Sequence, residues 1–315
     1  MKDLPDRPLR IVFAGSPEAA APSLRLLAGS PHEILAVVTR EDSPQGRRHV
    51  LTPTAVAAVA AELGLPVLKS NRVGSLTEDI RELHPDLGVI VAYGGLIREP
   101  LLSLPRLGWI NLHFSLLPRW RGAAPVQRSI IAGDEITGAT VFQLVPELDA
   151  GAVYGQFTQA IAPNQTAGNL LQSLSDAGAQ LLLRVLDALA DGSARAEPQS
   201  GDITAAPKLG IEDGRIDWSA HGAVVANLIR GVTPEPGAFT MVDGVRVKIL
   251  AATPAPGIRM PAGRFDYSDD RVLVGTGSDA LELLAVQPAG KNPMPAADWW
   301  RGRRPTQNQN TDGTM

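Results

Sequence analysis

The first forty residues alternate between a strand pattern and a helix pattern, and this order leaves the chain few possible folds. Leu9–Gly15 is a short apolar run that ends in glycine, which predicts a buried strand. Ser16 and Pro17 supply an N-cap and a proline at the first helical position, so we expect a helix to about Ala28. Ile34–Thr39 predicts a second buried strand. Strand, helix and strand at this spacing form a βαβ unit, which requires a parallel sheet.

Apolar runs and helical periodicity continue this alternation to about residue 190. We expect helices over 54–63, 75–83, 96–103, 123–132 and 166–190, and strands over 66–68, 86–92, 110–113, 138–145 and 153–161. The segments together predict an α/β fold with a Rossmann-like parallel sheet. The segment 40–53 shows neither periodicity, so we expect a long loop there.

The composition changes after residue 190 and predicts a second domain. Residues 191–207 are rich in alanine, serine, glycine and proline, which is typical of a linker. Residues 208–301 contain one helical segment and several short β runs separated by turn residues, which favours a small antiparallel barrel or sandwich. The polar tail 302–315 is expected to be flexible. We therefore predict a first domain over 1–190 and a second over 208–301.

Composition excludes several classes of protein. The absence of cysteine excludes disulfides, thiolate nucleophiles and cysteine-ligated metal sites. No apolar run approaches the roughly 18 residues of a membrane span, and the N-terminus lacks a signal peptide. We therefore expect a cytoplasmic protein without membrane contact. We also expect a monomer, although composition does not determine this. Net charge is −4, with 17 basic and 21 acidic residues through Pro207 and 12 of each after it, so nucleic-acid binding requires a local patch.

The stretch Gly108–Pro125 carries the strongest functional signal. Asn111 and His113 are two residues apart, so on a strand both side chains point to the same face. A loop rich in proline, arginine and glycine follows them. In open α/β sheets, ligands bind at the carboxyl ends of the strands. A histidine that carries protons needs an orienting acid, for which Asp149 in a glycine-flanked turn is the best candidate. The same aspartate could equally serve only to stabilise its turn.

Motifs of other chemistries are missing from the sequence. It contains no G-x-S-x-G elbow, no H-E-x-x-H zinc motif and no G-x-G-x-x-G dinucleotide fingerprint. What remains is direct transfer between two bound substrates, with asparagine donating to an oxyanion and histidine moving protons. Arg47 and Arg48 either belong to a solvated loop or contact an anionic partner. Tyr93 and Gly94 either approach a ligand closely or form a turn.

Several motifs resemble those of a known family. Asn111–His113, Ser115–Pro118 and Arg121–Pro125 resemble the signature of the folate-dependent formyltransferases, and Asp149 lies in a sequence similar to that family's LD-x-G turn. Shorter stretches narrow the resemblance to the branch that formylates methionyl-tRNA; they are Phe13–Pro17, Pro44–Arg47, Arg119–Gly122, Gly214–Trp218 and Gln287–Lys291. The resemblance therefore spans both predicted domains.

This resemblance implies an enzyme that transfers the formyl group of 10-formyltetrahydrofolate to the amino group of methionyl initiator tRNA, without a metal. It implies that Asn111 stabilises the oxyanion and that His113, oriented by Asp149, moves protons. It assigns folate binding to Tyr93, Gly94, Ser115, Leu116, Leu117 and Pro118, and tRNA binding to Arg47, Arg48 and an OB-like second domain. Phe114 stands where members of this family often have glycine, so we expect the side of the loop that faces the folate to be bulkier.

Two alternatives remain. One is formyl transfer to an amino sugar-nucleotide or a purine precursor, against which the basic loop and the second domain argue. The other is a non-enzymatic tRNA- or folate-binding protein, against which the intact set of Asn111, His113 and Asp149 argues.

Overall fold

Residues 7–45 and 49–303 are described by a computed structural model, in which the chain divides into two units. Unit 1 comprises Met1–Pro125, Ile136–Ala160 and Leu171–Pro207, and unit 2 comprises Val126–Glu135, Ile161–Leu170 and Lys208–Met315. Arg47 and Arg48, which we predicted to bind tRNA, lie outside the described residues. So does the predicted flexible tail from residue 304 onward.

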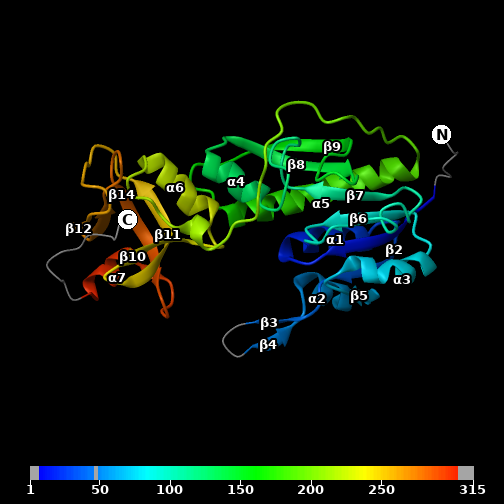
Figure 1. Cartoon of the computed structure of the whole chain (residues 1–315), viewed down its shortest axis with the longest axis horizontal. Coiled ribbons are helices and arrows are strands. Elements are labelled where there is room, and N and C mark those ends of the chain that lie inside the picture. Colours follow the sequence, from blue (N-terminus) through cyan, green and yellow to red (C-terminus); the bar gives the residue numbers. More distant parts are fainter. Residues whose placement is uncertain (1–6, 46–48, 304–315) are drawn as a thin grey trace. The chain divides into compact units, whose positions relative to one another are not determined.

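Unit 1 is built around a seven-stranded sheet in the order β5-β2-β1-β6-β7-β8-β9 (Figure 1). Its strands are β1 (Arg10–Gly15), β2 (Glu33–Thr39), β5 (Val67–Lys69), β6 (Leu87–Val91), β7 (Trp109–His113), β8 (Ile136–Gln143) and β9 (Val153–Ala160). The first five strands in that order pair in parallel, and β8 and β9 extend the sheet in antiparallel pairing. The predicted α/β class with a Rossmann-like parallel sheet is confirmed.

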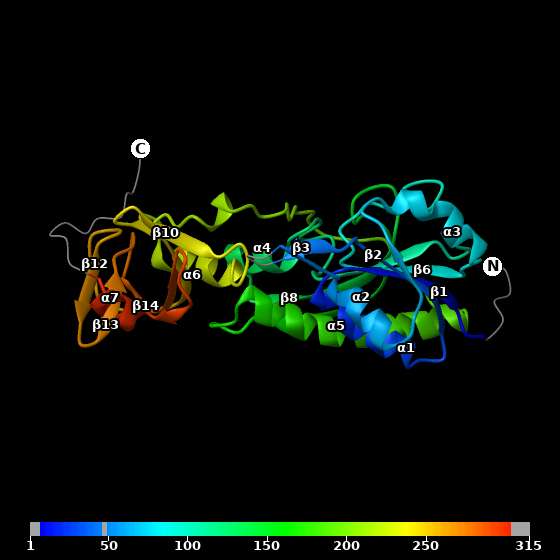
Figure 2. The ribbon, with the colours of Figure 1, turned by 90° about the horizontal axis from the view of Figure 1, so that it is seen from below.

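Helices cover both faces of this sheet. Figure 2 shows one face covered by α1 (Ala21–Ala28), α2 (Ala55–Glu62) and α5 (Ala167–Ala190, within unit 1 from Leu171), and the other by α3 (Thr77–Glu82). Leu112 of β7 packs against α5, because a Cβ added at Gly178 would lie 2.9 Å from its Cδ2 atom. Trp109 of the same strand belongs to a buried cluster that also contains Ile80 of α3 and Val73, which precedes that helix. Alternate residues of β7 therefore face opposite layers.

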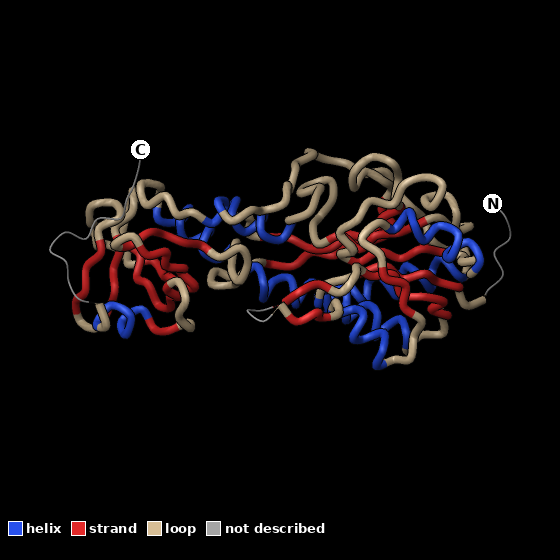
Figure 3. The backbone as a smooth tube through the Cα atoms, turned by 60° about the horizontal axis from the view of Figure 1, so that its bottom comes forward, coloured by secondary structure: helices blue, strands red, loops and turns tan. Residues whose placement is uncertain are grey.

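The segment 40–53 contains a β-hairpin, so our expectation of a loop without regular structure is wrong. Its strands are β3 (Ser43–Gln45) and β4 (Val50–Thr52), which form a sheet of their own apart from the seven-stranded sheet (Figure 3). Every residue of both strands is exposed. A strand that buries neither face has no alternation of apolar and polar residues from which it can be predicted.

The helix that we expected over 96–103 does not form, so that prediction is also wrong. The chain makes turns there, in which the Leu102 N–H donates to the Arg98 carbonyl at 3.0 Å. Pro100 lies in the middle of the segment, lacks an amide hydrogen and disfavours a helical conformation of Glu99.

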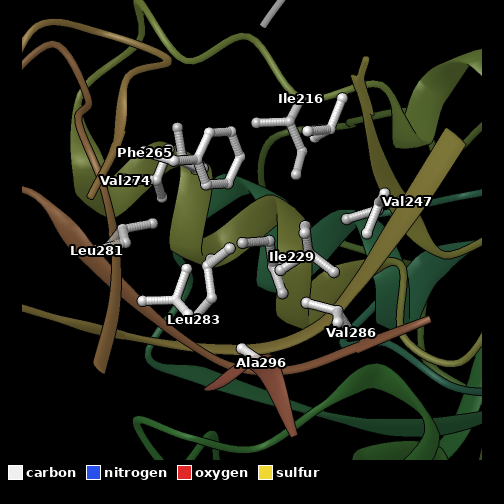
Figure 4. Close-up of a cluster of buried hydrophobic side chains, with 14 of the residues drawn as sticks. Ile216, Ile229, Val247, Phe265, Val274, Leu281, Leu283, Val286 and Ala296 are labelled. Atoms are coloured by element: carbon white, nitrogen blue, oxygen red, sulfur yellow. The ribbon is translucent and has the colours of Figure 1, made fainter. Parts of the chain in front are cut away.

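Unit 2 contains an antiparallel sheet in the order β10-β11-β14-β13-β12, with β15 paired to β14. Its elements are α4 (Pro125–Ala132, within unit 2 from Val126), α6 (Gly222–Gly231), β10 (Ala238–Val242), β11 (Val245–Pro254), β12 (Phe265–Ser268), β13 (Arg271–Val274), β14 (Leu281–Pro288), β15 (Met294–Pro295) and α7 (Ala296–Arg301). Ile229 of α6 meets Val247 and Leu283 of the strands in one buried cluster (Figure 4). The predicted antiparallel second domain is confirmed, whereas β15 and α7 were not predicted.

Gly88, near the amino end of β6, offers a test of the packing between β6 and β7. A Cβ at this glycine would lie 2.1 Å from two ring atoms of Trp109, which is fully buried and donates from its indole to the Leu101 carbonyl at 2.8 Å. We expect Gly88→Ala to lower the free energy of unfolding in urea by about 1–3 kcal/mol. Gly74→Ala is the matched control, since a Cβ there meets nothing within 4 Å. Equal effects of the two substitutions would contradict this packing.

Candidate active site

The carboxyl ends of β1, β6 and β7 lie at one edge of the sheet of unit 1. In the sheet, β2 pairs with one edge of β1 and β6 pairs with the other edge. The order of the strands along the chain therefore reverses at β1. Ligands of open α/β sheets bind in the crevice at such a reversal. A cleft of about 450 Å³ lies here, and its lining includes Ser16, Arg40, Thr54, Ala92 and Tyr93.

Asn111 and His113 lie on β7, the strand next to β6. Because Leu112 between them packs against α5, both side chains face away from that helix. Asn111 is half-buried, and its side-chain amide has no hydrogen-bond partner among residues 7–45 and 49–303. The amide is therefore available to donate to a ligand.

His113 is held on both sides of its ring. Its Nε2 atom lies 2.8 Å from the Trp120 carbonyl oxygen, and its Nδ1 atom lies 3.8 Å from Oδ2 of Asp149. The ring also meets Phe142 edge to face at a centroid distance of 6.4 Å. A carbonyl oxygen can only accept a hydrogen bond, so in the neutral ring the proton lies on Nε2. The basic nitrogen is then Nδ1, which faces the carboxylate.

Burial controls the charge of this histidine. His113 is 6% exposed, and removal of the imidazolium from water lowers its pKa below the usual value of histidine. The negative charge of Asp149 and the hydrogen bond to the Trp120 carbonyl oppose this effect. With the lowered pKa the ring is neutral near pH 7, which is the state that can accept a proton.

Asp149 lies in the turn between β8 and β9. Its φ of +48° is in the left-handed region, which aspartate tolerates better than most residues. The side chain is nearly buried, and its Oδ2 atom accepts a hydrogen bond from the Gly122 N–H at 2.8 Å. The structure therefore brings Asp149 to His113 from another strand connection, with Asn111 on the same strand face as the histidine.

The predicted folate-binding residues lie in two places. Tyr93 lines the cleft, but its side chain is buried, and its hydroxyl donates to the Ser70 carbonyl at 2.7 Å. Gly94 has a φ of +78°, and its carbonyl accepts from Arg40 at 2.5 Å. Gly94 is exposed, so at this turn a ligand can reach the backbone of the glycine but not the ring of Tyr93.

Ser115, Leu116, Leu117 and Pro118 form a packed turn after β7. Ser115 is fully buried and donates from Oγ to the Arg119 carbonyl at 2.6 Å, while its own carbonyl accepts from Thr140 Oγ1 at 2.7 Å. Leu116 is the least buried of the four. Phe114, where we expected bulk on the folate side, is 6% exposed and points into the protein.

Comparison with models of protein families assigns both parts of the chain to one family. The family described as "Formyl transferase" matches residues 9–186, and "Formyl transferase, C-terminal domain" matches residues 208–304. The chain belongs to the formyl transferase family. A curated relative from Leifsonia xyli subsp. xyli (strain CTCB07), named "Methionyl-tRNA formyltransferase", is 57% identical over 93% of this chain and 97% of its own length. A relative of the same name from Clavibacter sepedonicus is 56% identical with the same coverage.

A solved structure shows the same fold at lower identity. HypX from Aquifex aeolicus in complex with tetrahydrofolic acid matches 92% of this chain and 46% of its own length, with a TM-score of 0.63 and 19% identity. The likeness at this identity concerns the fold alone.

Sequence reasoning missed three residues around the site of this formyl transferase. Trp120 contributes through its backbone carbonyl, which no side-chain pattern reveals. Gln199 and Thr204 lie in the stretch 191–207, whose composition predicts a linker. Gln199 donates to the Asp149 carbonyl at 2.8 Å, and Thr204 accepts from the Trp120 N–H at 2.8 Å. No sequence signal identifies either contact.

We also searched the described residues for a metal-binding cluster and for a membrane-spanning helix. In the part of the chain that the structure describes, no group of three histidine, aspartate or glutamate side chains is arranged to hold a metal ion. Across residues 7–45 and 49–303, none of the helices has both the length and the apolar character needed to span a membrane.

Proposed function

We propose that this chain transfers the formyl group of 10-formyltetrahydrofolate to the free amino group of methionyl initiator tRNA. Relatives named for formylation of methionyl-tRNA match nearly their whole length, and both family domains are present. The observation that supports the chemistry is a buried His113 whose Nδ1 faces Asp149. Asn111 lies on the same strand face, and its amide has no hydrogen-bond partner among residues 7–45 and 49–303.

The reaction begins with attack of the methionyl amine on the formyl carbon. The carbonyl double bond opens, and its oxygen takes up a negative charge. Asn111 donates a hydrogen bond from its side-chain amide to this oxyanion, an interaction that is stronger in the transition state than with the neutral carbonyl. Because the amide has no other partner among the described residues, no protein hydrogen bond has to break first.

The attacking amine must lose a proton, and His113 accepts it on Nδ1. The imidazolium that forms has the Trp120 carbonyl on one side and the Asp149 carboxylate on the other. The bond between the formyl carbon and N10 of the folate then breaks, and His113 returns the proton to N10. The products are formylmethionyl-tRNA and tetrahydrofolate.

We place the folate against the backbone of Tyr93 and Gly94 at the cleft, with Ser115, Leu116, Leu117 and Pro118 forming the adjoining wall. The position of the cleft at the reversal of strand order supports this placement. So does the fold shared with a protein whose structure contains tetrahydrofolic acid.

We further propose that the protein acts as a monomer in the cytoplasm. Translation initiation, the process that the proposed product serves, takes place in the cytoplasm.

The function is tested by incubating the purified protein with 10-formyltetrahydrofolate and methionyl initiator tRNA. We expect formylmethionyl-tRNA to accumulate together with tetrahydrofolate. The alternative acceptors, an amino sugar-nucleotide and a purine precursor, are tested in parallel with the same donor. Formylation of one of these and not of the tRNA would overturn the proposal.

Arg47 and Arg48 are proposed to contact the acceptor stem of the tRNA. A charge-assisted contact is worth about 1.5–3 kcal/mol, so Arg47→Ala should lower kcat/KM for methionyl-tRNA by roughly 10–100-fold. The KM for 10-formyltetrahydrofolate should not change. Arg25→Ala, which removes an exposed arginine paired with Glu62, is the matched control. Equal losses of kcat/KM for methionyl-tRNA and for 10-formyltetrahydrofolate would argue against a tRNA contact.

A further inference from the structure

The stretch Glu197–Ala206, called the 197–206 segment below, crosses the site although its composition predicts a linker. Its first residue is tied to the start of β9, where Glu197 and Val153 exchange backbone hydrogen bonds of 2.9 and 2.7 Å. Its last residues run beside Arg121, whose N–H donates to the Thr204 carbonyl at 2.9 Å and whose carbonyl accepts from Ala206 at 2.7 Å. The segment is therefore fixed at both ends within unit 1.

Gln199 ties this segment to the turn that carries Asp149. Its Nε2 atom donates to two carbonyls, that of Asp149 at 2.8 Å and that of Gly151 at 2.9 Å. Its Oε1 atom accepts from Arg121 Nε and Nη2 at 3.2 and 2.6 Å. Every contact of the amide thus serves to hold the left-handed turn at Asp149 against the loop that follows β7.

Thr204 ties the segment to the other partner of the histidine. Its Oγ1 atom accepts from the Trp120 N–H at 2.8 Å, and the Trp120 carbonyl accepts from His113. Trp120 has a φ of +61°, a conformation that a bulky residue adopts only when its surroundings hold it. The neighbouring Gly122 is closely covered as well, since a Cβ there would lie 2.6 Å from the Ala206 carbonyl oxygen.

We propose that Gln199 and Thr204 are positioning residues for His113, with Gln199 holding Asp149 at the Nδ1 side of the ring and Thr204 holding the Trp120 carbonyl at the Nε2 side. The kinetic part of this inference rests on the proposed function, in which His113 carries the proton of formyl transfer. Small displacements of such a group are costly, because proton transfer requires hydrogen-bonding distance and alignment.

Gln199→Glu removes the two donated hydrogen bonds and adds a negative charge, so the uncharged variant Gln199→Leu is measured beside it. Glutamate keeps the acceptor for Arg121 but cannot donate to the carbonyls of Asp149 and Gly151. We expect kcat to fall by about 10–100-fold with little change in either KM, and Gln199→Leu to cause a loss at least as large. Gln159→Ala is the control, because this half-buried glutamine donates to Ser173 in the same unit. It should leave kcat unchanged.

Thr204 is tested with a pair of variants. Thr204→Val keeps the shape of the side chain but removes the acceptor for Trp120, so kcat should again fall by about 10–100-fold. Thr204→Ser restores a hydroxyl at the same position and should recover most of the activity. If valine and serine lower kcat equally, the hydroxyl does not position the site.

A second readout does not depend on activity. Titration of the histidine side chains by NMR, with His113 assigned from the His113→Gln spectrum, follows the ring directly. The Asp149 charge and the Trp120 hydrogen bond both raise the pKa of His113, so loosening either partner should lower the midpoint of its titration.

The outcomes of this titration decide the inference even if the proposed function fails. A lower midpoint in Gln199→Leu and Thr204→Val, with none in Gln159→Ala, supports positioning whether or not the protein formylates tRNA. An unchanged midpoint overturns it. A midpoint that rises toward that of an exposed histidine also overturns it, because the segment would then serve only to exclude water.

Discussion

Asn111→Ala is expected to lower kcat by about 10²–10³-fold, the loss typical of removing one oxyanion donor. The KM for both substrates should change little, because the interaction forms fully only in the transition state. The folded state should also be little affected, since the amide has no hydrogen-bond partner among the described residues to lose. Single-turnover formylation of methionyl-tRNA measures the chemical step directly.

Asn111→Asp sharpens this test. The carboxylate has nearly the shape of the amide but cannot donate, and its charge repels a developing oxyanion. The loss of kcat in Asn111→Asp should therefore equal or exceed the loss in Asn111→Ala. Asn71→Ala is the matched control, because this exposed asparagine donates to Glu41 outside the site. Turnover of Asn111→Ala close to that of the unmodified protein would remove this residue from the mechanism.

The strands of the parallel sheet were predictable from local sequence. Strands such as β1 and β6 are buried on both faces, so almost every position is apolar and the run is visible without knowledge of the fold. The pairing of Asn111 with His113 on one face follows from the strand period of two in the same way. Fully exposed strands such as β3 contain no apolar run or alternation from which they can be predicted.

The environment of the histidine was predictable only in part. Nothing in the spacing of residues shows that the turn at Asp149 reaches His113, so that pairing depended on the resemblance to a family. The Trp120 carbonyl has no side-chain signature at all. Thr204 contacts a residue 84 positions away from within a stretch of linker-like composition. Such contacts arise from the tertiary fold, which places distant loops at one sheet edge.

The pH dependence of the reaction should report the protonation of His113. The neutral ring accepts the proton of the amine, so the rate falls as pH drops through its pKa. Burial lowers that pKa, which places the acid limb below the value of about 6.5 for an exposed histidine. Asp149→Asn removes the negative charge that opposes this lowering. The pKa of His113 then falls further, and the acid limb should move to lower pH.

The same variant should lower kcat at pH 7 by about 10²–10⁴-fold, because the imidazolium formed during the reaction loses its counter-charge. Its asparagine oxygen can still accept from Gly122, so the turn keeps its hydrogen bond. Asp187→Asn is the control, since Asp187 pairs with buried His32 at 3.2 Å outside the site. That substitution should leave the pH profile of kcat unchanged. An acid limb that stays in place in Asp149→Asn would mean that the limb belongs to another group, and His113 would lose its role as the proton carrier.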